Sequence, residues 1–114
     1  MVLDIFTLEK EGGSLHNHVT FVVYCADGYY EFGWFGLGKN NQQMKSVTID
    51  HYKDWPTYRK KHSEGQTQKG LQELIDKART WTGEKYNLIS KNCKDFAEML
   101  CKFAGVTCSC SVLL

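Results

Sequence analysis

The spacing of apolar positions gives the first half of the chain the pattern of a β-sheet. Residues 2–8 and 18–25 are dense in β-branched and aromatic residues, and residues 44–50 alternate apolar with polar side chains. A turn-forming Ala-Asp-Gly at 26–28 joins the second run to the aromatic run 29–35, which predicts a β-hairpin. We therefore expect an antiparallel sheet in this half.

The second half has apolar residues at the three- and four-residue intervals of amphipathic helices. One helix is predicted between residues 68 and 83, and another begins near Asn92 and ends at Gly105, a residue type common after helix ends. The first stripe contains Leu71, Leu74, Ile75, Ala78 and Trp81, and the second contains Phe96, Ala97, Leu100, Cys101 and Ala104.

Residues 51–68 show neither the alternation of a strand nor the three- and four-residue spacing of a helix clearly. Trp55 precedes the only proline, and a residue before proline avoids helical geometry, so no helix is expected to run through that pair. A helix starting at Pro56 is the alternative, because proline suits a first helical position. Together the two halves predict a single α+β domain with helices packed against an antiparallel sheet.

Composition narrows the class of protein. The 114 residues suit one domain, with 42% hydrophobic and 24% charged residues, and the net charge of +1 gives no reason to expect a nucleic-acid partner. No apolar run is long enough for a transmembrane segment, and no signal peptide is expected at the start. The five cysteines lack a disulfide-scaffold spacing, which indicates reduced thiols and a cytoplasmic location.

One cysteine lies where a thiolate forms most easily. Cys93 follows Asn92, a strong N-cap residue, and Asp95 three residues after the cap completes the pattern of a capping box. The unpaired amides and the dipole of a helix start stabilise a thiolate and an oxyanion formed beside it. The pattern predicts a nucleophile, and Cys101, on the apolar stripe, is expected to be buried like Cys25.

A nucleophilic cysteine needs a base, and the sequence offers His16, His18, His51 and His62. His18 opens the most apolar strand, where a rigidly held side chain can face a helix packed across it. His16 lies two residues earlier, points the same way in an extended chain, and is the alternative base. The alternative is that the histidine beside this strand has no catalytic role and is merely hydrogen-bonded at the surface.

Two stretches carry a resemblance to a known family. "YNLISKNCKDFAEML" resembles the Y-N-L…N-C-x-x-F signature of permuted papain-like proteins, and "HVTFVVYCADGYYEFGW" is similar to their histidine strand. The pattern looks most like the PPPDE family of desumoylating isopeptidases, also linked to thioester cleavage. The lecithin–retinol acyltransferase-like proteins are a related branch. The resemblance implies a permuted papain-like domain over residues 1–107, a tail at 108–114, and a Cys93–His18 dyad.

The sequence also departs from these relatives. Asp95 stands where the acyltransferase branch often has a histidine, and the return strand offers Glu31 instead of a second histidine. Glu31 is a candidate to orient His18, with an exposed strand carboxylate as the alternative. Tyr86 and Asn92 are candidates to line the substrate or oxyanion site, although Asn92 can serve only as the cap.

Two other motifs do not fit a cofactor. Residues 33–40 satisfy G-x-x-x-x-G-K, but asparagine replaces the hydroxyl residue that would hold magnesium. A zinc set of His16, His18, Cys108 and Cys110 matches no recognised spacing, so we expect no cofactor and no metal.

The sequence therefore predicts a cysteine hydrolase that acts through an acyl-enzyme on an amide, isopeptide or thioester bond. Its partner would be a protein conjugate or an acylated substrate. A phospholipase or acyltransferase and a non-catalytic binding module are the alternatives.

Overall fold

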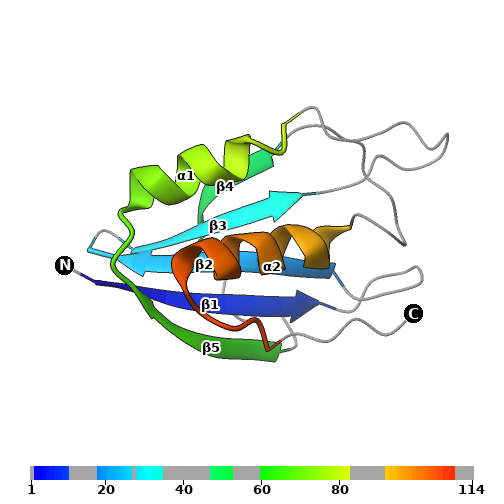
Figure 1. The fold of residues 1–114 in the computed structure, drawn as a ribbon. Coiled ribbons are helices and arrows are strands. Elements are labelled where there is room, and N and C mark those ends of the chain that lie inside the picture. Colours follow the sequence, from blue (N-terminus) through cyan, green and yellow to red (C-terminus); the bar gives the residue numbers. More distant parts are fainter. Residues whose placement is uncertain are drawn as a thin grey trace, which may run out of the picture.

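The computed structural model describes residues 2–10, 18–26, 28–34, 47–52, 60–82 and 92–109, with the backbone alone at 10, 18, 47–52 and 60. These residues form an α+β fold in which an antiparallel sheet carries two helices on one face (Figure 1). The elements are β1 Leu3–Lys10, β2 His18–Cys25, β3 Gly28–Trp34, β4 Val47–Tyr52, β5 Lys60–Thr67, α1 Leu71–Arg79 and α2 Cys93–Ala104.

The sheet has the strand order β4-β3-β2-β1-β5, and each neighbouring pair is antiparallel. The apolar strand β2 is therefore central. The predicted β2–β3 hairpin is confirmed: Cys25 pairs with Gly28, whose φ of 127° lies where glycine is favoured. The predicted strand at 44–50 is also found, as β4 at 47–52.

β5 was not predicted, because the sequence assigned neither a strand nor a helix to residues 51–68, and the alternative helix start at Pro56 lies outside the described residues. Its sequence, KKHSEGQT, has no apolar residue, so neither period marks it. As an edge strand paired only with β1, it needs no hydrophobic face of its own. A bulge opposite Ile5 and Phe6 bends the strand next to Gly65, whose φ is 138°. An added Cβ there would lie 3.1 Å from the Val106 side chain.

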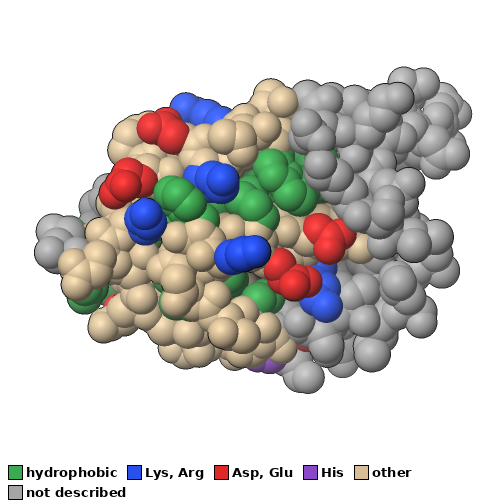
Figure 2. Space-filling model, in the orientation of Figure 1, with side chains coloured by type: hydrophobic (Ala, Val, Ile, Leu, Met, Phe, Trp, Pro, Cys, Tyr) green, Lys and Arg blue, Asp and Glu red, His purple; other side chains and the backbone are tan. Residues whose placement is uncertain are grey.

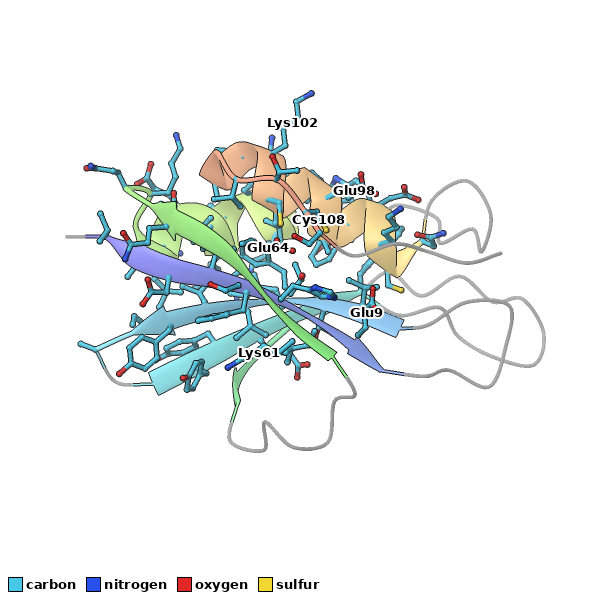
Figure 3. The ribbon with its side chains drawn as sticks, turned by 90° about the horizontal axis from the view of Figure 1, so that it is seen from below. Glu9, Lys61, Glu64, Glu98, Lys102 and Cys108 are labelled. Carbon is cyan, nitrogen blue, oxygen red and sulfur yellow. The ribbon has the colours of Figure 1, made fainter. Side chains whose placement is uncertain are left out.

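The two helices cover the same face of the sheet, and the main core lies between them and the strands (Figures 1 and 3). α2 lies across the central strands β2 and β3, with α1 beside it toward β4. The predicted stripe of α2 is confirmed, because all five of its residues are buried. In α1, Leu74 and Ala78 are buried, and Trp81 lies in the turn after the helix rather than within it.

The first residues of the predicted tail pack against β5. Glu64 accepts hydrogen bonds from the Ser109 amide, at 2.7 Å, and from the Ser109 and Thr7 hydroxyls. Cys108 is partly buried against the core (Figure 3). Neither helix that the structure describes is long and apolar enough to cross a membrane.

Candidate active site at the start of α2

The capping box predicted for α2 is confirmed in full. The Asn92 side-chain oxygen accepts hydrogen bonds from the amides of Lys94, at 3.0 Å, and Asp95, at 3.2 Å. In return the Asp95 carboxylate accepts the Asn92 amide at 2.9 Å. These contacts fix where the helix begins, so Cys93 is its first residue, as the sequence predicted.

The Cys93 sulfur lies against the backbone of β2. The amide of Val19 donates a hydrogen bond to it at 3.4 Å, although the two residues are 74 positions apart in the chain. Val19 directly follows His18, so the Cα of His18 is about 3.8 Å from that of Val19. The fold therefore brings the predicted nucleophile to the strand end that His18 opens.

An aromatic cluster lies beside this part of α2. The Trp34 ring, at the end of β3, is 4.9 Å from Trp81 and 6.1 Å from Phe96, and the last two are 5.6 Å apart. Phe96 lies three residues after Cys93, so the cluster ties the first turn of the helix to β3 and to the end of α1. Sequence reasoning missed this cluster, because apolar periodicity gives the buried face of each element but not which faces meet.

Cys93 itself is fully buried. Its side chain belongs to the core between sheet and helices, which gives the sulfur a low-dielectric setting. In this conformation a substrate carbonyl reaches the sulfur only after neighbouring atoms move. The N–H contact and the helix start favour a negative charge on the sulfur, whereas burial in an apolar core opposes one, so a thiolate here depends on these contacts and on a base.

The candidate bases are described to different extents. His18 is the first residue of β2, where the backbone alone is described, and His16 and Tyr86 lie outside the described residues. A contact between the His18 ring and the Cys93 sulfur therefore stays a prediction. His62 lies on the edge strand β5, where its ring nitrogen is 3.7 Å from the buried Glu9 carboxylate, and Glu9 pairs with Val19 in the β1–β2 ladder.

Glu31 is not brought to the Cys93 site. It pairs with Val22 in the β2–β3 ladder, four residues or about 13 Å along the strand from His18. Its neighbours Tyr30 and Phe32 both pack toward the helices, so alternation places Glu31 on the other face of the sheet.

The other described cysteines differ in how deeply they are buried. Cys101 is buried in the α2 stripe, as predicted. Cys25 is only partly buried, packed against the core at the hairpin, where its thiol donates to the Gly28 carbonyl at 3.6 Å. The zinc alternative depends on His16 and Cys110, which lie outside the described residues, and those described contain no cluster of metal-ligating side chains.

Comparison with protein families gives one match. The model of the PPPDE putative peptidase domain matches residues 11–107, which include β2, β3 and both helices. Comparisons with curated proteins and with solved structures gave no match.

Proposed function

The chain belongs to the family of the PPPDE putative peptidase domain, and we propose that it is a cysteine hydrolase with Cys93 as nucleophile and His18 as general base. Its substrate would be a protein joined through an amide or isopeptide bond, or an acyl thioester. A permuted papain-like arrangement and a cytoplasmic location are parts of the same proposal.

The proposed reaction has two halves. His18 takes the proton of the Cys93 thiol, and the sulfur attacks the substrate carbonyl carbon. The oxyanion forms beside the first turn of α2, where main-chain amides and the helix dipole stabilise negative charge. The C–N bond then breaks, His18 gives its proton to the leaving amine, and a thioester links the acyl group to Cys93.

Water completes the second half. His18 removes a proton from water as it attacks the thioester, and the C–S bond breaks to release a carboxylic acid and the thiol. A thioester substrate would follow the same path with a thiol as the leaving group. Asn92 and Tyr86 are proposed to line the site, and Asn92 also holds the cap that positions Cys93.

The Val19 amide contact with the Cys93 sulfur is the observation that carries this proposal. It brings the residue that follows His18 to the Cys93 sulfur, and the family resemblance implies that this histidine and this cysteine act together. Chain order alone does not bring them together, because β3, β4, β5 and α1 lie between them.

The burial of Cys93 favours a second candidate, a binding module that keeps the fold without catalysis. A buried cysteine on an apolar helix face is also a good packing residue. The two candidates differ in whether Cys93 reacts, so mutation of this residue separates them.

The test is hydrolysis by Cys93→Ser, with Cys101→Ser as the matched control. Both cysteines are buried on α2, two turns apart, so both changes place a hydroxyl in the same core. Three substrates are assayed: a ubiquitin-like isopeptide conjugate, an acyl thioester and a phospholipid.

Cys93→Ser is expected to lose at least about a thousandfold in kcat/KM. Cys101→Ser should keep the parent rate per folded molecule, with folding checked by circular dichroism. If Cys93→Ser has the same activity as the parent on every substrate, the cysteine hydrolase proposal is wrong and the binding module is the remaining candidate. Cleavage of the phospholipid alone would instead identify the acyltransferase-like branch.

A further inference from the structure

The surface between α1 and α2 is hollowed around one aromatic side chain. Three hollows, of about 500, 340 and 400 Å³, meet at Phe103, which is partly buried near the end of α2. Figure 2 shows apolar side chains along the line between the two helices, with lysine or arginine side chains beside them. We call this region the Phe103 surface.

Positive charge is concentrated on this surface. The Lys69 and Lys77 ammonium groups lie 4.6 and 5.4 Å from the centre of the Phe103 ring. Lys102 lines the hollow of 400 Å³ together with Lys77, Met99 and Phe103, and none of the described residues around that hollow is acidic. Within the part of the chain that the structure describes, none of these three lysines forms an ion pair.

The acidic groups nearby are engaged on α1. Glu73 and Asp76 line the other hollows. The Glu73 carboxylate accepts the Gly70 amide at 2.8 Å in the cap of α1, and Asp76 accepts the Gln72 side-chain amide at 2.9 Å. An incoming carboxylate is therefore favoured on the Lys77 and Lys102 side of the ring, away from these acids.

We propose that the Phe103 surface binds an acidic segment of a protein, with one apolar side chain against Met99 and Phe103 and flanking carboxylates on Lys77 and Lys102. The acidic protein would be the substrate of the proposed hydrolase, so this inference rests on the proposed function. The surface would select conjugates by a feature remote from the bond that is cleaved.

The dimensions suit a protein substrate. Phe103 lies ten residues after Cys93 on a straight helix, about 15 Å away along its axis, a span of about five extended residues. A substrate whose carbonyl lies at Cys93 can therefore reach both ends of α2. An anionic membrane fits less well, because the surface is concave, its rim contains Glu73 and Asp76, and the net charge of the chain is only +1.

The binding test uses the full chain with Cys93→Ser, which removes hydrolysis from the measurement. The probe is a fluorescein-labelled peptide with one leucine between pairs of glutamates, titrated by fluorescence anisotropy. Lys77→Glu and Lys102→Glu are compared with Lys61→Glu, a matched control on the opposite face of the sheet, where Lys61 lies over the Phe6 ring (Figure 3).

Each reversal on the Phe103 surface should weaken binding about five- to tenfold, and Lys61→Glu should leave it unchanged. Replacing the leucine by serine, or raising the salt to 0.5 M, should also weaken binding. Equal affinity across the three variants overturns the proposal. So does binding to phosphatidylserine vesicles with none to the peptide.

A second measurement separates this inference from the hydrolase itself. In the chain with an intact Cys93, Lys102→Glu should raise KM for an acidic conjugate and leave kcat unchanged. Peptide binding by a chain without any hydrolase activity would refute the proposed function and keep the surface. If the chain is active and Lys102→Glu leaves KM unchanged, the Phe103 surface is not a substrate site, and the proposed hydrolase function stands.

Discussion

The two ends of α2 are built for different tasks. The first turn is held by a reciprocal side-chain cap and an aromatic cluster, and its cysteine is fully buried against β2. The last turn ends at Gly105 in a left-handed conformation and carries Phe103, hollowed on several sides and surrounded by lysines. Chemistry at a sulfur needs fixed geometry and low dielectric, whereas recognition of a partner needs accessible surface and unpaired charge.

The largest predicted effect concerns the base at the buried end. His18→Ala should lose about as much kcat/KM as Cys93→Ser, and the double variant should be little worse than either, because each change already removes the nucleophilic route. Single and double variants are compared on the substrate that the parent cleaves fastest.

His62→Ala is compared in the same experiment, since His62 is a candidate base whose ring lies beside Glu9, the β1 residue that pairs with Val19. Additive losses in the double variant would show that His18 and Cys93 act separately. Parent-like activity of His18→Ala would assign the base to another histidine, with His16 the first to test.

The second prediction compares two phenylalanines on the same helix. Phe96 is fully buried between Trp34 and Trp81, and Phe103 is partly exposed. Phe96→Ala should lower the free energy of unfolding by about 3–5 kcal/mol, since it removes a large ring and leaves a cavity. Phe103→Ala should cost roughly half of that or less, because water can fill its place.

Urea denaturation of both variants measures the difference. Similar losses would mean that the Phe103 end of α2 is as firmly packed as the Cys93 end. In that case the contrast between a rigid end and an accessible end would be wrong.

The elements that the sequence predicted correctly are those whose signal is local. The cap of α2 follows from Asn92 and Asp95 alone, and the β2–β3 hairpin follows from a turn at 26–28 between two apolar runs. The stripe of α2 could be predicted because each of its residues contacts the same core. These features require no knowledge of what lies far away in the chain.

The features that the sequence did not predict depend on long-range pairing. β5 is a strand because β1 offers it hydrogen bonds, which a polar sequence does not reveal. Glu31 was considered as a partner of His18 because the return strand offers it in place of a second histidine, but the register pairs it with Val22, four residues along β2 from His18. The lysines around Phe103 come from both helices and the turn before α1, so their grouping depends on how the helices pack.

The smallest predicted effects compare the two caps of α2. Asn92→Ala removes the acceptor for two amides and should cost about 1 kcal/mol of unfolding free energy, much of which Asn92→Ser should restore. Gly105→Ala should cost about as much for a different reason. An added Cβ there meets nothing within 4 Å, so the cost is that of a left-handed backbone at φ 86°, and Gly105→Asn should recover part of it.

Urea denaturation measures the four variants, and their hydrolysis rates distinguish the two ends. Only the changes at Asn92 should alter kcat, because only that cap positions Cys93. If Asn92→Ser restores stability without restoring the rate, the Asn92 side chain contacts the substrate as well as capping the helix. An equal loss of rate in Gly105→Ala would show that the whole helix, rather than its first turn, sets the position of the sulfur.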